Sequence, residues 1–508
     1  MKQGRSLVMN TVADNGSLSL PLPLYRAAQV RELDRLAIEE QGIPGITLME
    51  RAGQAAFARL QTRWPRARSL GVLCGVGNNG GDGFIVARLA VEAGYTVRVW
   101  QVGDAQKIRG DALAAREQLL AAGLGITAFD GSGLGDCEVL VDGLLGTGLA
   151  GEVAGVWRQA IAAINAAREA GAQVLALDIP SGLHADTGQM LGAAVQAQVC
   201  VTFIGLKLGL FTGQGPALCG EIAFADLGVP PAVFASVAPA ARRLSWDQYS
   251  LPPRRPTAHK GDFGHVLVVG GDEGMAGALR LAGEAALRTG AGLVTAATRA
   301  GHAAMISAAR PELMAHGVES VAALRQLLKR ATVLAVGPGL GQADWGRRLF
   351  SALLDSQQPL VVDADALNLL AAEPLQRHNW ILTPHPGEAA RLLGQSVAQV
   401  QADRIAAASA LQQKYGGVVV LKGAGTVIVD EAGAIGLCSE GNPGMASGGM
   451  GDVLTGVIAG LLAQGAGLAD AARQGVCLHA HAADLAARDG QRGLLASDLF
   501  PVMRCLLG

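Results

Sequence analysis

The chain alternates between short, almost uniformly apolar runs and longer amphipathic runs. In the first half the apolar runs cover residues 69–77, 95–103, 138–142, 173–178 and 198–204. The amphipathic runs before and between them include residues 26–42, 82–94 and 111–123. Short apolar runs predict strands buried on both faces, and amphipathic runs predict helices that cover them. We therefore predict a parallel sheet with helices on both sides.

This pattern breaks at residues 242–256, RRLSWDQYSLPPRRP, which carry charge and proline with little periodicity. We interpret the segment as a linker. Apolar runs then resume at 265–271, 292–298, 332–339, 359–365, 379–386, 417–425 and 426–430, with helical runs at 277–290 and 451–465. The prediction is two tandem three-layer α/β/α domains, over 25–240 and 254–506. The halves share no repeated motif, so duplication is not supported.

Composition narrows the class of protein. Half of the 508 residues are hydrophobic and 17% are charged, which supplies ample core for folded domains. The net charge of −2, without a basic stripe or an aromatic platform, gives nucleic-acid binding no support. We find no apolar run of about 18 residues and expect no membrane span. The first twenty or so residues do not resemble a signal peptide, and we predict a loose extension there.

Seven cysteines are scattered along the chain, and no C-x-x-C pair exists. Their odd number and irregular spacing favour buried free thiols in a reducing compartment over zinc sites or disulfides. We accordingly expect a cytoplasmic protein.

Polar residues follow three strands of the first domain. Residues 75–83, GVGNNGGDG, follow the first strand, Asp142 ends a second strand, and Asp178 ends a third with Ser181 close behind it. Ligands of open parallel sheets bind outside the carboxyl ends of the strands, so these residues are expected at one rim.

The glycine-rich stretch contains G-x-G-x-x-G at Gly75, Gly77 and Gly80. Such a turn before a helix favours a phosphate, although a plain tight turn explains it equally well. A dinucleotide-dependent dehydrogenase also needs an acid at the end of the next strand, and none occurs before Asp104. The sequence therefore argues against a dehydrogenase.

Asn79, Asp142 and Ser181 offer hard oxygen atoms from three loops. One carboxylate with neutral oxygens suits a weakly held monovalent cation better than a transition metal. Ordinary turn hydrogen bonds account for each residue singly. Asp178 is a candidate acid/base, and helix capping is the alternative for it.

The second domain contains a glycine-rich turn, Gly448 to Gly451, that opens a helical run with Asp452 at its start. Backbone N–H groups and the helix dipole would then stabilise negative charge beside a carboxylate. That arrangement suits phosphoryl transfer, with Asp452 accepting the proton of a substrate hydroxyl. No Walker motif is present. Helix capping by Asp452 is the simpler alternative.

Further candidates follow other strands of this domain. Lys422 opens a Gly-Ala-Gly turn that could cover a nucleotide or form a plain hairpin. His385 and Glu388 follow a strand in TPHPGE, and Asp363 and Asp365 end another strand, where they could simply cap a helix.

The second domain has two more features that bear on ligand binding. Residues 337–341, GPGLG, form a turn that permits close approach of a ligand. His479 and His481 lie two apart on a predicted helix, hence on different faces, so we reject a metal pair there.

The first domain resembles the NAD(P)H-hydrate epimerases. LMERAG, CGVGNNGGDGF, VDGLLGTGL and LDIPSGL match that family's motifs in order, over about residues 25–236. The resemblance implies interconversion of R- and S-NAD(P)HX, in which a hydroxyl sits on ring carbon 6, with Asp178 transferring the proton. It implies potassium at Asn79, Asp142 and Ser181. The implied NAD(P)HX-binding residues are Asn78, Asn79, Gly80, Gly81, Asp82, Gly146, Thr147, Gly148, Leu149, Ala150, Gly151, Glu152 and Asp178.

The second domain resembles the ribokinase-like NAD(P)H-hydrate dehydratases through KGDFGHVLVVGG, GPGLG, TPHPGE, KGAGT and NPGMASGGMGD, in order over about residues 254–506. The resemblance implies ADP-dependent dehydration of S-NAD(P)HX, which yields NAD(P)H, AMP and phosphate. Magnesium is expected with the diphosphate. The implied NAD(P)HX contacts are Ala276, Gly339, His385 and Asp452, and the implied adenine-nucleotide contacts are Lys422, Gly423, Ala424, Gly425, Thr426 and Gly451.

The two implied activities complement each other, because hydration gives both epimers and the dehydratase uses one. Three rival hypotheses are a small-molecule kinase, a dehydrogenase and a non-catalytic nucleotide sensor. The partners expected are NADHX, NADPHX and ADP. We also expect a homo-oligomer, although alanine-rich helices suit a core as well as an interface.

Overall fold

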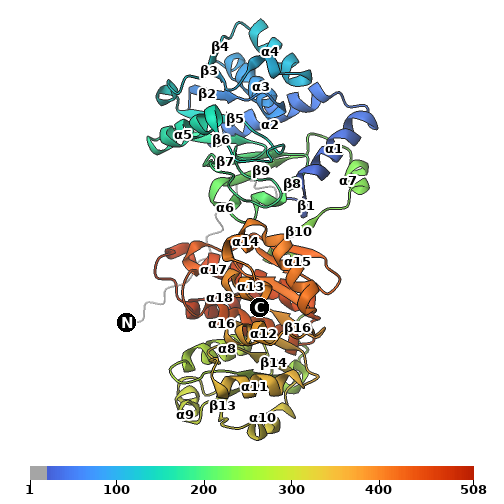
Figure 1. The fold of residues 1–508 in the computed structure, drawn as a ribbon, viewed down its shortest axis with the longest axis vertical. Coiled ribbons are helices and arrows are strands. Elements are labelled where there is room, and N and C mark those ends of the chain that lie inside the picture. Colours follow the sequence, from blue (N-terminus) through green and yellow to red (C-terminus); the bar gives the residue numbers. More distant parts are fainter. Residues whose placement is uncertain (1–19) are drawn as a thin grey trace.

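The computed structural model describes residues 20–508. The predicted N-terminal extension lies outside these residues. The described part folds into two α/β regions stacked along the long axis of the molecule (Figure 1). No helix in residues 20–508 is long and apolar enough to cross a membrane.

The first region is built on a sheet with the strand order β4-β3-β2-β5-β6-β7-β9. Every pairing in this sheet is parallel, as predicted. Its strands are β2 (Ser69–Cys74), β3 (Thr96–Gln101), β4 (Ile126–Ala128), β5 (Val139–Gly143), β6 (Gln173–Leu177), β7 (Val199–Phe203) and β9 (Glu221–Ala225). Its helices are α1 (Ala27–Glu39), α2 (Gly45–Arg63), α3 (Asn78–Glu92), α4 (Gly110–Ala121), α5 (Gly155–Glu169), α6 (Gly215–Leu218) and α7 (Pro231–Ser236).

The second region contributes nine neighbouring strands to a larger sheet. These are β11 (His265–Val269), β12 (Leu293–Thr298), β13 (Met314–Gly317), β14 (Val333–Val336), β15 (Leu360–Val362), β16 (Trp380–Leu382), β17 (Val418–Leu421), β18 (Thr426–Val429) and β19 (Ile435–Cys438). Strands β11 to β17 pair in parallel, and β17, β18 and β19 pair antiparallel. The segment from β17 to β18 is thus a hairpin around Lys422 to Gly425.

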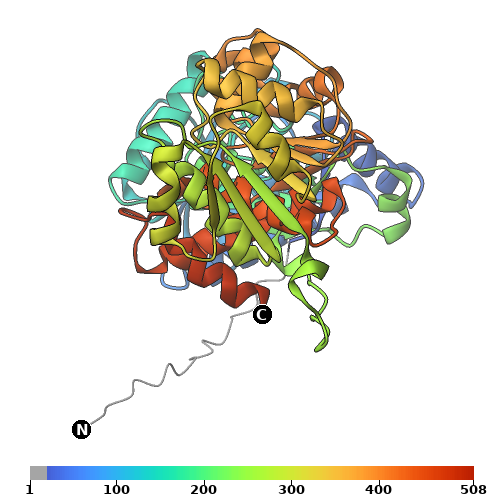
Figure 2. The ribbon, with the colours of Figure 1, turned by 90° about the horizontal axis from the view of Figure 1, so that it is seen from below.

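Helices cover both faces of this second sheet (Figure 2). Val266 and Val268 of β11 pack with α16 and α17, whereas Leu267 and Val269 pack on the opposite face with α11 and α12. Side chains alternate along a strand, so an apolar run needs a cover on each side. The helices are α8 (Ala276–Thr289), α9 (Ala300–Ala309), α10 (Val321–Leu328), α11 (Asp344–Leu354), α12 (Ala364–Ala372), α13 (Pro386–Leu393), α14 (Val397–Ala402), α15 (Arg404–Tyr415), α16 (Met450–Ala463), α17 (Leu468–Ala486) and α18 (Leu499–Leu507).

The larger sheet continues from the second region into the first. Beyond β19 it adds β10 (Ala241–Leu244), β1 (Pro23–Tyr25) and β8 (Leu206–Lys207). The prediction of a linker is therefore wrong over its first residues. The charged Arg243 is the reason that the sequence does not indicate this strand. Its side chain is nevertheless buried, and its guanidinium donates hydrogen bonds to the carbonyl oxygens of Leu20 and Pro21.

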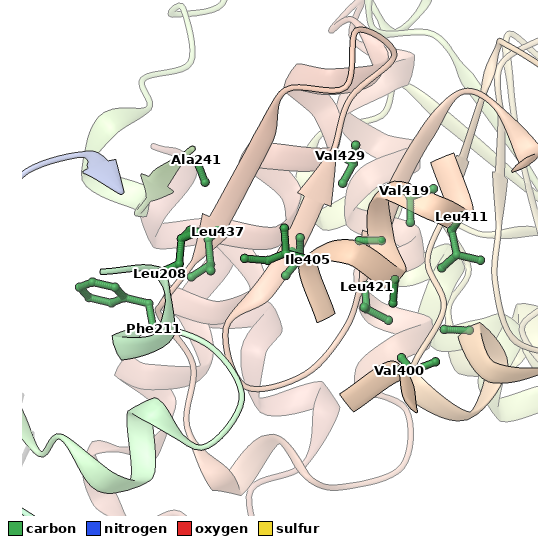
Figure 3. Close-up of a cluster of buried hydrophobic side chains, with 14 of the residues drawn as sticks. Leu208, Phe211, Ala241, Val400, Ile405, Leu411, Val419, Leu421, Val429 and Leu437 are labelled. Atoms are coloured by element: carbon green, nitrogen blue, oxygen red, sulfur yellow. The ribbon is translucent and has the colours of Figure 1, made fainter. Parts of the chain in front are cut away.

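The hydrophobic core also crosses between the regions. Leu208 and Phe211 lie beside Leu437 of β19 in one buried cluster (Figure 3). Burying a side chain of this size contributes about 1.5–3 kcal/mol. The backbone comes close here too, because a Cβ added at Gly425 would collide with the carbonyl oxygen of Phe211. The β17–β18 hairpin thus rests directly on the first region.

Candidate functional site

A pocket of about 750 Å³ opens at the carboxyl ends of β2, β5, β6 and β7. It gathers most of the residues predicted for the first site. The predicted residues in its lining are Asn78, Asn79, Asp82, Gly146, Thr147, Gly148, Leu149, Ala150 and Asp178. Gly80, Gly81, Gly151 and Glu152 are not among its lining residues.

The glycine-rich stretch serves close packing as much as ligand binding. Helix α3 begins at Asn78, directly after Gly77. A Cβ at Gly80 would collide with the carbonyl oxygen of Gly75, and one at Gly81 would lie 2.6 Å from the sulfur of Met49. These two glycines therefore allow the start of α3 to pack closely against the end of β2 and against α2. The neighbouring residues Asn78, Asn79 and Asp82 line the pocket instead.

Asp178 occupies a strained backbone position at the end of β6, with φ of 63°. Left-handed backbone at a residue other than glycine costs about 1–3 kcal/mol and often marks a functional residue. Its Oδ1 atom accepts from the Phe203 N–H at 3.2 Å and forms an ion pair with Lys207. Capping of a helix, the alternative drawn from the sequence, is not what this residue does.

Lys207 comes from β8, in the sheet that continues into the second region. Its side chain is fully buried, and its ammonium also donates to the Thr202 hydroxyl and the Phe203 carbonyl oxygen, both at 3.0 Å. A buried ammonium needs such partners to offset its lost hydration. Lys207 therefore fixes the position of the Asp178 carboxylate.

Two further carboxyl groups line the same pocket. Burial raises the pKa of Asp34 to about 6, against the lowering effect of Lys207. Burial and the charges of Asp178 and Asp34 raise the pKa of Asp82 well above its ordinary value. Both carboxyl groups thus bind protons more readily than ordinary aspartates, and both line the pocket that contains the Asp178–Lys207 pair.

Asn79, which lines the pocket, lies near Asp142 and Ser181, which do not line it. The Ser181 hydroxyl donates to Asp142 at 2.6 Å, and the Asn79 amide donates to the Leu145 carbonyl oxygen at 3.2 Å. The Asn79 Oδ1 atom is buried and has no hydrogen-bond partner in the described part of the chain. An orphaned amide oxygen among carboxylate, hydroxyl and carbonyl oxygens fits a hard cation such as potassium.

The second site lies at the start of α16. Gly449 has φ of 90° and precedes the helix, as the glycine-rich turn predicted. Asp452 lies in the first turn and makes no capping hydrogen bond. Burial, and then the charge of Asp363, raise the pKa of Asp452 to about 6. The carboxylate is therefore free to act as a base near neutral pH.

Asp363 anchors this site. Its carboxylate accepts from the Lys422 ammonium at 2.7 Å and from the Thr455 hydroxyl at 2.9 Å. A Cβ at Gly451 would lie 3.3 Å from the Lys422 Nζ atom. Asp363 precedes α12 without capping it through its side chain, so the capping alternative is wrong for this residue.

Arg404 stabilises the turn that follows β17. This buried guanidinium donates to the carbonyl oxygens of Leu421, Lys422 and Gly425 at 3.2–3.3 Å. Burial lowers the pKa of Arg404 to about 10. The predicted nucleotide turn is thus fixed by Arg404 on one side and by Phe211 on the other.

His385 caps α13, because its Nδ1 atom accepts from the Gly387 N–H at 2.9 Å. Half of its side chain is exposed, so the rest of the ring stays accessible. Burial, and then the charge of Lys422, lower the pKa of His385. Burial raises the pKa of the neighbouring Glu388 to about 7.

Gly339 and Ala276 are brought close together. Gly339 has φ of 58°, and a Cβ there would lie 2.7 Å from the Cβ of Met275, which directly precedes α8. The structure thus gathers Lys422, Gly451 and Asp363 around the α16 start and places Gly339 against Met275, the residue before Ala276.

Sequence reasoning missed Lys207, Asp34, Arg404 and Thr455. Asp34 and Thr455 sit inside amphipathic or apolar helices and carry no motif. Lys207 follows an apolar run in TFIGLKLGLF, where an isolated charge was the available signal.

Comparison with known proteins agrees with this geometry. A family model described as YjeF-related protein N-terminus matches residues 45–209, and one described as NAD(P)H-hydrate dehydratase matches residues 266–504. Among solved structures, a ribokinase-like superfamily protein from Enterococcus faecalis V583 is similar at 30% identity and a TM-score of 0.50, covering 53% of this chain and 95% of that one. The second region therefore has the ribokinase-like fold.

Another solved structure is the ADP/ATP-dependent NAD(P)H-hydrate dehydratase from Bacillus subtilis, co-crystallised with ATP and Mg²⁺. It is 31% identical, with a TM-score of 0.45, over 51% of this chain and 93% of that one. Over nearly the full length, the bifunctional NAD(P)H-hydrate repair enzyme Nnr of Coxiella burnetii (strain RSA 493 / Nine Mile phase I) is 52% identical, over 95% of this chain and 99% of the relative. The chain belongs to the family of bifunctional NAD(P)H-hydrate repair enzymes.

Proposed function

We propose that the first region interconverts R- and S-NAD(P)HX and that the second dehydrates the S epimer with ADP. The observation that carries the proposal is a pair of similar sites, each with a lysine–aspartate pair beside a glycine-rich helix start. Each lies at the carboxyl ends of parallel strands, where such sheets bind ligands. Membership of the family supplies the substrate class.

In the epimerase site, Asp178 donates a proton to the ring hydroxyl, which then leaves as water. Loss of water from carbon 6 is assisted by the lone pair of the ring nitrogen, and water then adds to the other face. A proton leaves Asp178 in the first step and returns in the second. Lys207 stabilises the carboxylate between these steps, and the raised pKa values of Asp34 and Asp82 make both groups bind protons more readily than ordinary aspartates. Such acid/base transfer contributes about 10²–10⁴-fold to rate.

The pocket lining accommodates the dinucleotide. We assign its contacts to Asn78, Asp82, Gly146 to Ala150 and Asp178. Asn79, Asp142 and Ser181 would hold potassium, which would supply positive charge beside the loop that follows β5. The orphaned Asn79 oxygen supports this assignment.

In the dehydratase site, the oxygen of the ring hydroxyl attacks the terminal phosphorus of ADP. Asp452 accepts the proton of that hydroxyl as the attack occurs. The bond between phosphorus and the bridging oxygen breaks, and AMP leaves. The phosphorylated carbon then loses phosphate with help from the ring nitrogen, which gives NAD(P)H. Lys422 and the backbone N–H groups that open α16 stabilise the charge on the phosphates.

Lys422 to Thr426 and Gly451 are proposed to contact ADP, and Ala276, Gly339, His385 and Asp452 to contact NAD(P)HX. Magnesium would enter with the diphosphate, as such ions are usually bound through one or two carboxylates and substrate phosphates. Asp363 and Asp452 offer the carboxylates that this chemistry requires.

The test is recovery of reduced-nicotinamide absorbance from a mixture of R- and S-NADHX, with ADP, with ATP and with neither. The proposal predicts complete recovery that depends on ADP and releases AMP and phosphate in equal amounts. Accumulation of a stable phosphorylated product with ATP would instead support the rival small-molecule kinase. No recovery with any nucleotide would overturn the proposal.

A further inference from the structure

A cluster of metal-ligating side chains lies away from both proposed sites, between β19 and α17. The thiols of Cys438 and Cys477 and a carboxylate oxygen of Glu440 all lie within 4.8 Å of one another. In residues 20–508 this is the one group of three or more such side chains with that spacing. Neither step of the proposed reactions uses any of these three groups.

The secondary structure explains why these ligands converge. Cys438 ends β19, and Glu440 follows two residues later from the same strand end. Cys477 and His481 are four residues apart on α17, so they share one face of that helix. The His481 Nδ1 atom lies 2.8 Å from the Glu440 carboxylate. A C-x-E pair on a strand therefore faces a C-x₃-H pair on a helix.

We propose that Cys438, Glu440 and Cys477 bind a thiophilic divalent transition metal such as Zn²⁺, with His481 as the partner that orients Glu440. Two thiolates and a carboxylate form a ligand set that selects such metals over Mg²⁺ or K⁺. Ligand atoms of a tetrahedral zinc lie about 3.5–4 Å apart, so the cluster has to contract by about an ångström at most. Solvent supplies the fourth ligand.

The surroundings suit this assignment. Both cysteines are buried, whereas the side chains of Glu440 and His481 are 18% and 32% exposed, which leaves an entry path. The other carboxylate oxygen of Glu440 accepts from the Trp246 N–H at 2.8 Å, so the ligand is held on both sides. Outer partners of this kind orient metal ligands and raise their affinity.

Charge balance also favours the site. Two thiolates and a carboxylate outweigh a divalent cation by one negative charge, and the buried Arg243 guanidinium lies within electrostatic reach of all three ligands. The cysteines would bind the metal as thiolates, so metal binding would release protons to solvent. Asp247, Asp484, Arg473 and Tyr249 are the other titratable groups near the cluster.

A bound metal would also restrain the loop that leads to the second site. Glu440 lies two residues before Asn442, whose amide donates to Asp484 of α17 at 2.9 Å. The loop that starts there leads to Gly449 and Asp452. Metal binding would thus join β19 to α17 at the root of this loop.

The experiment uses the full-length protein, reduced with a non-thiol reductant and freed of metal, with free thiols counted beforehand. Co²⁺ is then added as the probe, and Zn²⁺ is used to displace it. We expect one Co²⁺ per chain, with a thiolate-to-cobalt charge-transfer band and the visible bands of tetrahedral cobalt. Zn²⁺ should abolish these bands and raise the thermal midpoint of the protein.

Variants separate this site from other thiols. Cys438→Ser and Cys477→Ser should each abolish the charge-transfer band, and His481→Gln should weaken binding about 10–100-fold. Cys219→Ser is the matched control, because Cys219 and Cys200 form another buried thiol pair. It should leave the band unchanged. Glu440→Gln, which replaces a partly exposed side chain, tests the third ligand if a cysteine variant fails to fold, and should remove tight binding.

Three results would overturn the proposal. The first is a reduced wild-type protein without a charge-transfer band. The second is a band that persists in folded Cys438→Ser or Cys477→Ser protein. The third is a band that Cys219→Ser removes.

Discussion

The two proposed sites use the same pair of residue types in different ways. In the first site, Lys207 pairs with Asp178, the residue proposed to transfer the proton. In the second site, Lys422 pairs with Asp363, and Asp452 makes no side-chain hydrogen bond in the described residues. The lysine thus stabilises the reacting carboxylate in one site and a neighbouring carboxylate in the other.

This difference matches the chemistry required of each carboxyl group. Epimerisation needs Asp178 to lose a proton and to regain it. The ion pair with Lys207 stabilises the Asp178 carboxylate between these two steps. Phosphoryl transfer needs a base that takes one proton. Burial beside Asp363 raises the pKa of Asp452 to about 6, so it stays ionised at neutral pH yet binds a proton more readily than an ordinary aspartate.

The largest expected effect comes from Asp452→Asn, which removes the base without changing its size. Dehydration of S-NADHX should fall about 10²–10⁴-fold, while exchange between the epimers should continue. Stopped assays that separate R- and S-NADHX measure both rates. Asp470→Asn, at an exposed acid in the first turn of α17, is the matched control and should change neither rate. Equal loss of both activities in Asp452→Asn would break the assignment of separate sites.

Removing either lysine should destabilise the fold, because it leaves its aspartate partner without a compensating charge. Lys207→Met and Lys422→Met should each lower the free energy of unfolding by about 3–5 kcal/mol. The double variants Lys207→Met/Asp178→Asn and Lys422→Met/Asp363→Asn should recover part of that loss. Urea unfolding of these four variants, and of Asp178→Asn and Asp363→Asn alone, completes both double-mutant cycles. Strict additivity of the two single changes would show that the pair does not interact.

Gly425→Ala tests the contact between the regions. Gly425 has φ of 67°, and a methyl group there would collide with the Phe211 carbonyl oxygen. Gly433→Ala is the control, since Gly433 has φ of 83° and open space around it. Both changes carry a backbone cost of about 1–2 kcal/mol. Only Gly425→Ala should also raise the KM for ADP; equal KM values would contradict the role of this contact.

The smallest effect is on pH dependence. Dehydration should fall about tenfold per pH unit below about 6, as Asp452 gains a proton and stops acting as a base, and it should level off above that pH. Glu388→Gln and Asp34→Asn should keep this acidic limb, although both groups also carry raised pKa values. Loss of the limb in Glu388→Gln would assign it to Glu388 instead.

The buried parallel strands could be predicted from the sequence because both of their faces are apolar. The edge strands β4, β9 and β13 could not, since they are short and partly exposed and lack a clear apolar run. The linker prediction is wrong for β10 because a charged residue such as Arg243 indicates an exposed segment. In the folded chain Arg243 is buried, and its guanidinium makes hydrogen bonds that the sequence does not reveal.

The candidate sites likewise contain residues that could be predicted from the sequence and residues that could not. Gly449 and Asp452 stand in one contiguous motif, so the helix start they form could be predicted. Lys207 and Asp178 are 29 residues apart and meet only because β8 leaves the first sheet to join the larger one. Partners brought together by sheet topology leave no local signal in the sequence.

The measurement that tests the central claim most directly gives separated R- and S-NADHX to the Asp178→Asn variant with ADP. We predict that S-NADHX is converted to NADH at the wild-type rate and that R-NADHX is used no faster than its uncatalysed epimerisation. Use of R-NADHX at the wild-type rate, or loss of S-NADHX dehydration, would contradict the claim that Asp178 serves epimerisation alone.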